Sequence, residues 1–257
     1  MLLKTAPLAP IFGAQTKIEF LRLFRIPAFS LTSLLLPVMF YTFFGLADAK
    51  QQFMNTTYGS YMLASYGAYA VLTIVLFSFG ASVAAERGTG ATRLMRAAPL
   101  PPVAYFFGKI VAAMGFGAIA LTVLVLFAAV TGGAHVSAVT FMNLLVRLLL
   151  GSIPFTILGF AIGYLASLNS AIAIINLINL PLAFASGMFI PTKFLPGFVQ
   201  HITPFLPNYH FAQLAWGAVG ATSESWVTAS LWLLGYGIVF LFIAVRAYGR
   251  DERKEFA

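Results

Sequence analysis

The sequence predicts an all-α polytopic membrane protein with six transmembrane helices. Hydrophobic residues make up 60% of the 257 residues and charged residues only 9%, whereas about a quarter of the residues in a soluble domain are charged. Six separate stretches reach the roughly 20 apolar residues that a helix needs to cross a bilayer. These stretches are continuously apolar instead of alternating, and only helices satisfy their own backbone hydrogen bonds within lipid, so spanning strands are not expected.

The six expected spans form a single transmembrane domain that covers residues 1–257. They lie at residues 27–46, 59–84, 104–131, 139–166, 171–190 and 226–248. Pro154 is expected to bend the fourth span, because proline removes a backbone donor and its ring clashes with the preceding turn. Gly159 and Gly163 in the same span predict a face on which another helix packs closely. Cysteine is absent, which excludes disulfides and thiolate chemistry.

The distribution of Lys and Arg predicts a multi-pass protein of the cell (inner) membrane with both termini in the cytoplasm, because cytoplasmic loops retain positive charge. With the N-terminus inside, the outer segments contain only Lys50 and Lys193. The inner cations are Lys4, Lys17, Arg22, Arg25, Arg87, Arg93, Arg96, Lys109, Arg246, Arg250, Arg253 and Lys254. The net charge of +8 therefore reflects topology against the lipid bilayer, and no nucleic-acid partner is expected.

An N-terminal amphipathic interfacial helix is expected before the first span, at residues 10–26. Its polar side would carry Gln15, Glu19 and Arg22, and its apolar side Leu23 with the neighbouring phenylalanines. This pattern is typical of a helix that lies along the inner membrane surface. A simple cytoplasmic extension of the first span is the alternative.

The connection between the second and third spans, residues 84–102 (AAERGTGATRLMRAAPLPP), is the longest charged interruption on the expected inner side. Thr89 can cap a short helix, Arg93 and Arg96 favour its C-terminal end, and Pro99 begins the proline-rich segment that stops it. A helix of about two turns, presented parallel to the membrane, would be a docking surface for a cytoplasmic partner. A positively charged loop that only fixes topology is the alternative.

A proline-rich apolar segment, residues 190–225, separates the fifth and sixth spans. Neither half is long enough to cross the bilayer, and the segment is too apolar for a free extracellular loop. We expect extracellular re-entrant helices that dip into the outer leaflet. They could close the outer end of a pathway or form a structural lid on the bundle.

Several polar residues lie inside the expected spans. Inserting the charge of Arg147 into the membrane costs about 2.5–3.5 kcal/mol on insertion scales. Its side chain is therefore expected either to reach headgroups and loop carbonyls or to attract an anionic substrate or lipid headgroup. Asn176 and Asn179 precede Pro181, whose ring opens a local kink, so this stretch is expected to face inward. The asparagines could bond to neighbouring helices or, together with Arg147 and Pro181, line a translocation pathway.

Catalytic and metal-binding patterns are not found in the sequence. It has no catalytic carboxylate pair, no Gly-x-Ser-x-Gly and no His-Glu-x-x-His. His135, His201 and His210 fall on the outer side at spacings that match no helical ligand pattern. We therefore expect no enzyme activity, no metal site and no cofactor bound by this chain.

Two segments carry a resemblance to a known family. The segments ERGTGATRLMRAAPLPPVAYFFGK, at 86–109, and NLPLAFASGMFIPTKFLPGFVQHITPFLPNYH, at 179–210, resemble the permeases of the ABC-2 type exporter family. The first matches a family pattern of a Glu, a Gly-Thr step, a basic helix, a proline-rich stop and a Gly-Lys that opens the next span. The second matches a fifth span broken by a proline, a small-residue turn near Gly187 and an outer re-entrant pair.

This resemblance implies the permease subunit of an ATP-binding cassette exporter, which moves an amphiphilic or hydrophobic drug, peptide or lipid-like molecule outward. In the family the first segment is the cytoplasmic coupling helix that meets the ATPase. That role falls here on Glu86, Arg87, Gly88, Thr89, Arg93 and Arg96. The resemblance also implies cytoplasmic ATP-binding subunits, which hold ATP and Mg, and a second permease copy or a paralogue as a dimer partner. The chain has no Gly-x-x-x-x-Gly-Lys-[Ser/Thr] loop to bind ATP itself.

An ATP-independent channel or ion-coupled carrier is one alternative function, and a membrane enzyme or assembly scaffold is another. A coupled carrier generally keeps buried carboxylates within its spans as proton or sodium relays. None of the six expected spans has a carboxylate in its middle, which favours the exporter. Substrate identity stays open, because an apolar cavity suits many hydrophobic cargoes.

Overall fold

The computed structural model describes residues 8–255 except residues 92–100. In this part of the chain, six helices are long and apolar enough to cross a membrane. They are Pro27–Gly45, Tyr58–Gly88, Pro102–Val130, Ala138–Leu165, Leu168–Ala185 and Trp226–Asp251. The predicted all-helical class and the number and order of the spans are confirmed, so the chain is a multi-pass membrane protein. The second and sixth spans are longer than predicted, and the fifth begins and ends earlier.

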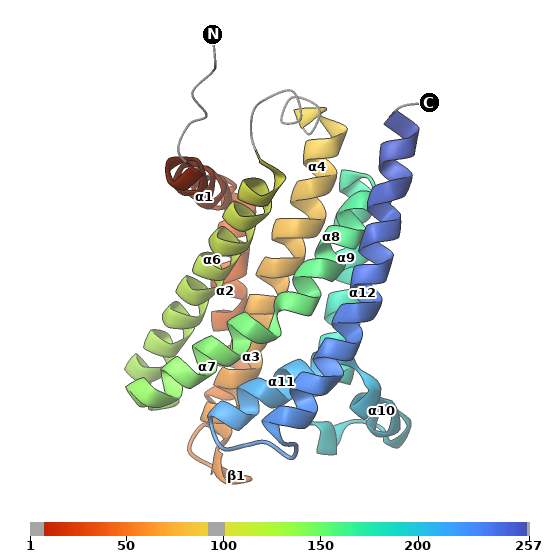
Figure 1. Ribbon diagram of the computed structural model, residues 1–257. Helices are drawn as coiled ribbons and strands as arrows, with labels where there is room; N and C mark the ends of the chain where they lie inside the picture. The colour runs from red at the N-terminus through yellow and green to blue at the C-terminus, as the bar shows by residue number, and fades with distance from the viewer. Residues whose placement is uncertain (1–7, 92–100, 256–257) are drawn as a thin grey trace.

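The helices form one bundle (Figure 1). Their bounds are α1 (Leu8–Phe24), α2 (Pro27–Phe40), α3 (Tyr58–Leu76), α4 (Ser82–Gly88), α6 (Pro102–Val130), α7 (Ala138–Gly151), α8 (Ile153–Leu165), α9 (Leu168–Ala185), α10 (Gly197–Ile202), α11 (Pro207–Ala218) and α12 (Trp226–Glu255). After the first span, two short strands, β1 (Gln52–Phe53) and β2 (Thr56–Thr57), pair antiparallel. In Figure 1, α1 and the last turns of α4 and α12 lie at one end of the bundle, whereas β1, α10 and α11 lie at the other. We call these the α1 end and the α11 end.

The second span is the centre of the core. α3 and α4 are joined by a π-helical turn, Phe77–Ala81, so residues 58–88 form one continuous helix. The most apolar window of this helix is 72% buried, whereas the fifth and sixth spans are each 22% buried. Helices α2, α6, α8 and α11 all pack against α3. The other spans therefore surround the second one and leave much of their apolar surface to lipid.

The fourth span is bent, as its proline predicts. α7 ends at Gly151 and α8 begins at Ile153, with Pro154 in the first turn of α8. A proline is well tolerated there, because the first amides of a helix have no intrahelical acceptor. Figure 1 shows α7 running at a slant, while α8 runs beside α12.

α1 lies across the α1 end and packs against α6 and α2 (Figure 1). Its polar side chains face the protein: Gln15 and Glu19 are 9% and 6% exposed, whereas Ile18 is 60% exposed. A Cβ added at Gly108 would lie 2.7 Å from Gln15 Cγ, so this glycine allows α6 to approach α1 closely. The helix itself is present at the predicted place, and its position in the membrane interface stays a prediction.

Gly159 and Gly163 form the predicted packing face. A Cβ added at Gly163 would lie 2.9 Å from Val83 Cβ and 3.0 Å from the Gly80 carbonyl oxygen. A Cβ added at Gly159 would lie 3.0 Å from Phe79 Cβ. The two glycines therefore set the distance between α8 and the second span.

Replacing Gly163 by alanine is expected to lower the free energy of unfolding by about 1–3 kcal/mol, because the added methyl group overpacks this contact. A lower midpoint of thermal aggregation in detergent would report the loss. Gly235→Ala on α12 is the matched control. Among the described residues, no heavy atom beyond the neighbouring backbone of α12 lies within 4 Å of a Cβ added there. Equal midpoints for the two variants would contradict the prediction.

The segment between the fifth and sixth spans folds into short helices, as predicted. α9 ends in a turn at Gly187, whose φ of 87° is favourable only for glycine. The amide of Gly187 donates to the carbonyl of Phe184 at 3.2 Å, and that of Met188 to Ala183 at 3.1 Å, which is the pattern of a Schellman cap. The predicted small-residue turn is confirmed. α10 and α11 contain 6 and 12 residues, and their depth in the bilayer stays a prediction.

Candidate functional site

A buried ionic cluster lies at the α1 end, where α1, α4 and α6 meet. At its centre is Lys109 of α6, which is 2% exposed. Its Nζ lies 3.0 Å from Glu19 Oε2 on α1 and 2.7 Å from Glu86 Oε1 on α4. It also donates to Ser82 Oγ at 2.8 Å. The three donor positions of the ammonium group thus have three acceptors from two other helices.

Glu86 is the second centre of this cluster and is 5% exposed. Arg22 donates to its Oε1, and the Tyr105 hydroxyl donates to its Oε2. Ser82 Oγ lies 3.2 Å from Oε1. Two carboxylates and two basic side chains, those of Glu19, Glu86, Arg22 and Lys109, therefore balance in charge. Such balance is required because an uncompensated buried charge is strongly destabilising.

Helical spacing places these side chains together. On each of the three helices, a pair of polar residues four positions apart lies on one face. The pairs are Gln15–Glu19 on α1, Ser82–Glu86 on α4 and Tyr105–Lys109 on α6. Within the first pair, Gln15 Nε2 donates to Glu19 Oε1 at 3.2 Å. Because most of these side chains are buried, they satisfy their hydrogen bonds by meeting one another between the three helices.

Arg87 makes a separate set of contacts with α8 and α12. Its Nε donates to Asp251 Oδ2 at 2.9 Å, and its Nη2 pairs with the other oxygen of that carboxylate. Its Nη1 donates to the Gly163 carbonyl at 2.8 Å, and the guanidinium carbon lies 5.2 Å from the centre of the Tyr164 ring. Adjacent helical residues point about 100° apart because a turn has 3.6 residues. Glu86 and Arg87 therefore connect the last turn of α4 to different helices, Glu86 to α1 and α6 and Arg87 to α8 and α12.

The predicted coupling residues thus fall into three groups. Glu86 and Arg87 point into the protein and make the contacts just described. Gly88 and Thr89 are exposed. Arg93 and Arg96 lie outside the described residues, as does most of the predicted coupling helix.

The sequence predicts that Thr89 caps the start of the next helix, but in the structure it lies at the end of α4. It is the C-cap of α4, and its hydroxyl donates to the Ala85 carbonyl at 3.1 Å. Gly90 follows with a φ of 72°, a left-handed conformation typical of the residue after a helix end. The Gly-Thr-Gly run therefore ends α4 directly after the Glu86–Arg87 pair.

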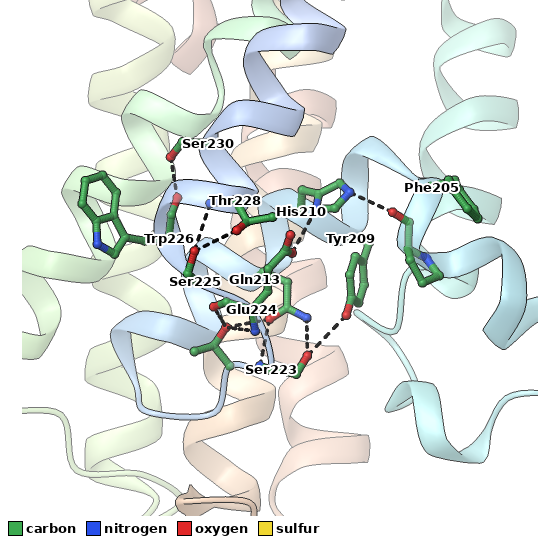
Figure 2. Close-up of polar contacts among 12 residues, drawn as sticks. Phe205, Tyr209, His210, Gln213, Ser223, Glu224, Ser225, Trp226, Thr228 and Ser230 are labelled. Atoms are coloured by element: carbon green, nitrogen blue, oxygen red, sulfur yellow. Dashed lines mark hydrogen bonds and ion pairs between the residues drawn. The ribbon is translucent and has the colours of Figure 1, made fainter.

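A second polar cluster lies at the α11 end (Figure 2). His210 Nδ1 lies 3.0 Å from Glu224 Oε2, and His210 Nε2 lies 2.9 Å from the Pro204 carbonyl. Gln213 Nε2 donates to Ser223 Oγ at 2.9 Å. These bonds hold the loop between α11 and α12 against α11. The bonds of His210 thus join α11 to the segments that precede and follow it.

The residues predicted to line a pathway have different surroundings. Asn179 is 3% exposed, and its Nδ2 donates to Thr73 Oγ1 of α3 at 2.9 Å. Asn176, one turn earlier, is exposed. α9 continues through Pro181, which is also exposed. Arg147 lies on α7, beside α11. The contact of Asn179 is of the kind expected for helix packing, and a pathway role for these four residues stays a prediction.

Sequence reasoning missed several members of the ionic cluster. Lys109 was treated as an inner cation and as part of the Gly-Lys step of the family pattern, and Ser82 and Tyr105 were assigned no role. Asp251, the partner of Arg87 outside this cluster, was also assigned no role. The available signal was the repeated spacing of two polar residues four positions apart at the end of an apolar helix. That signal identifies a polar face but not the partner helix that covers it.

Comparison with known proteins agrees with this architecture. Residues 11–219 match the model of the family described as ABC-2 type transporter. The chain is also similar to YvfS of Bacillus subtilis (strain 168), a candidate transport permease by its name. The two sequences are 28% identical over 234 residues, which cover 91% of this chain and 95% of that protein. The family match includes the whole ionic cluster as well as α11.

Proposed function

Since the chain belongs to the ABC-2 type transporter family, we propose that it is the permease subunit of an ATP-binding cassette exporter. It would move an amphiphilic or hydrophobic molecule, such as a drug, a peptide or a lipid-like compound, out across the cell (inner) membrane. A separate cytoplasmic ATP-binding subunit, which holds ATP and Mg, would supply the energy. A second permease copy or a paralogue would complete the transporter. The observation that carries this proposal is the pair of connections at Glu86 and Arg87. These residues come just before residues 89–98, the segment expected to dock the ATP-binding subunit, which we call the docking loop.

The two connections give the loop a mechanical link to four helices. Glu86 joins α4 to α1 and α6, and Arg87 joins α4 to α8 and α12. Charge-assisted hydrogen bonds are short and directional, particularly the forked bonds of an arginine to a carboxylate. A displacement of the loop by the ATP-binding subunit would therefore move these helices together, as rigid-body models of switching require.

The arrangement of the ends supports cytoplasmic termini. α1, the last turn of α4 and the last turns of α12 lie at the same end of the bundle (Figure 1). Most of the Lys and Arg residues in the segments between and beyond the spans belong to this end. Such an excess of positive charge is typical of the cytoplasmic side. The docking loop and both termini would then face the same compartment as the ATP-binding subunit.

The buried carboxylates do not favour an ion-coupled carrier. Glu19 and Glu86 are each paired with a basic side chain, and both lie at the α1 end instead of the middle of a span. Proton and sodium relays in carriers generally lie near the middle of the membrane. The cluster has the position and charge balance of a structural connection.

Reversing the charges of the docking loop tests the proposed function. Arg93→Glu with Arg96→Glu is expected to reduce co-purification of the ATP-binding subunit, and ATP hydrolysis by the complex, by at least about tenfold. A tenfold loss needs only about 1.4 kcal/mol, and like-charge contacts at an interface cost several kcal/mol. Gel filtration of the variant should match the wild-type profile. Lys50→Glu with Lys193→Glu reverses two charges on the other side and serves as the control. Wild-type hydrolysis and co-purification for the Arg93/Arg96 variant would show that the loop does not dock the subunit.

A further inference from the structure

Arg147 has no protein partner among the described residues. Its side chain is half-buried on α7, and neither a hydrogen bond nor an ion pair joins it to a described residue. A Cβ added at Gly217 of α11 would lie 2.7 Å from Nη1 of Arg147. A side chain at position 217 would therefore collide with the guanidinium. A guanidinium has five donors, and leaving it unpaired beside lipid is unfavourable. An acceptor from outside the protein would compensate it.

An apolar groove of about 470 Å³ begins at this arginine. It runs between the α7–α8 bend and α12, and α11 closes one end. Its lining includes Arg147, Pro154, Leu214, Trp226, Gly237 and Leu241. The volume lies within the range of about 300–1,000 Å³ that is typical of ligand pockets. Arg147 is the charged residue in this lining, and its charge is positive.

The groove continues along α12 toward the α1 end. A second apolar groove of about 400 Å³ shares Ile157 and Leu241 with the first and extends to Tyr248. From Trp226 to Leu241, α12 rises about 22 Å at 1.5 Å per residue. This exceeds the depth of one leaflet, which is about 15 Å of a hydrocarbon layer about 30 Å thick. The first groove alone is long enough for a lipid acyl chain.

Trp226, which lines the same groove as Arg147, indicates that this end of the groove lies near the membrane interface. Trp226 begins α12 and is 64% exposed, and exposed tryptophans concentrate at membrane–water interfaces. Figure 2 shows its indole pointing away from the His210 cluster. A headgroup placed beside Trp226 would therefore have its phosphate near Arg147 and its chains directed into the membrane.

We propose that this groove binds one anionic phospholipid from the leaflet at the α11 end. The headgroup phosphate pairs with Arg147, and one acyl chain lies in the groove between α8 and α12. The unpaired cation explains the choice of an anionic occupant, and the length of the apolar lining explains the choice of a lipid. The site is independent of the ATP-binding subunit, so its test does not depend on the proposed transport function.

Lipid selectivity of the purified full-length protein tests this site. After delipidation in detergent, phosphatidylglycerol is expected to raise the thermal midpoint by about 3–6 °C at a concentration about tenfold above its Kd. Phosphatidylcholine should have a smaller effect. Arg147→Met should abolish the difference between the two lipids, whereas Arg147→Lys should keep part of it. Lys193→Met removes an exposed cation at the same end and should behave as the wild type.

A second pair of variants tests the acyl-chain groove without changing any charge. Gly237 lines the groove, so Gly237→Leu fills it and should weaken retention of phosphatidylglycerol in native mass spectrometry at least about tenfold. Gly235→Leu adds the same side chain on α12 outside this groove, and retention should be unchanged. Full selectivity in Arg147→Met, equal losses in the two leucine variants, or the same midpoint shift with inorganic phosphate alone would each overturn the proposal.

Discussion

Replacing Lys109 by methionine is expected to lower the free energy of unfolding by about 3–5 kcal/mol, the effect of leaving a buried charge without its partner. Glu19 would then keep only the hydrogen bond from Gln15, at 3.2 Å, among the contacts of the described residues. Glu86 would keep Arg22 and Tyr105. The loss should appear as a lower thermal midpoint in detergent and as less protein in the membrane fraction.

Two further variants separate the loss of the ion pair from the loss of the lysine itself. Lys50→Met removes an exposed lysine and should leave the thermal midpoint unchanged. Glu19→Gln combined with Lys109→Met removes both members of a buried pair, which is often nearly neutral for stability. The thermal midpoint of the double variant should therefore be close to that of the wild type. If Lys109→Met and Lys50→Met had equal midpoints, the cluster would not stabilise the fold.

The same double variant also tests how the cluster acts in transport. If the cluster transmits movement between α1, α4 and α6, the variant should be stable but should remain poor at stimulating ATP hydrolysis by the ATP-binding subunit. Wild-type hydrolysis in a stable double variant would mean that the cluster contributes to stability alone.

The spans were predictable because the signal for each of them is local. About 20 consecutive apolar residues suffice to identify a spanning helix, and each span contains its own. The span ends were less predictable. The second span was expected to stop at residue 84 and the sixth at 248, because charges follow both positions. The helices continue past these positions because the charges there are paired inside the protein. Glu86 is paired with Arg22 and Lys109, and Arg87 is paired with Asp251.

The ionic cluster and the separate contacts of Arg87 could be predicted only in part. The charges of residues 84–102 pointed to the correct end of the second span, and Glu86 and Arg87 were named as coupling residues. Their burial was not foreseen, because it depends on Lys109 and Asp251. Lys109 bonds to Glu19 across 90 positions of the sequence, and Arg87 to Asp251 across 164. Hydrophobic periodicity describes one helix at a time and cannot identify such partners.

Substitutions that break the Arg87–Asp251 pair are expected to weaken the mechanical coupling between the docking loop and α12. In a cycle of Arg87→Ala, Asp251→Ala and the double variant, the coupling free energy for stability should be about 1.5–3 kcal/mol, as for hydrogen bonds between charged groups. Arg87→Lys keeps the charge but loses the forked geometry. It should therefore reduce stimulated ATP hydrolysis about as strongly as Arg87→Ala while unfolding at a higher temperature.

Arg246→Lys is the matched control for this substitution. Arg246 is on the sixth span, as Asp251 is, but it is exposed, and its guanidinium carbon lies 4.3 Å from the centre of the Phe242 ring. Because the Phe242 contact lies within α12 itself, the control should retain wild-type hydrolysis and stability. Strict additivity of the two alanine substitutions, or normal hydrolysis in Arg87→Lys, would contradict the prediction. Either result would mean that α12 moves independently of α4, and Glu86 would then be the connection through which the loop acts on the bundle.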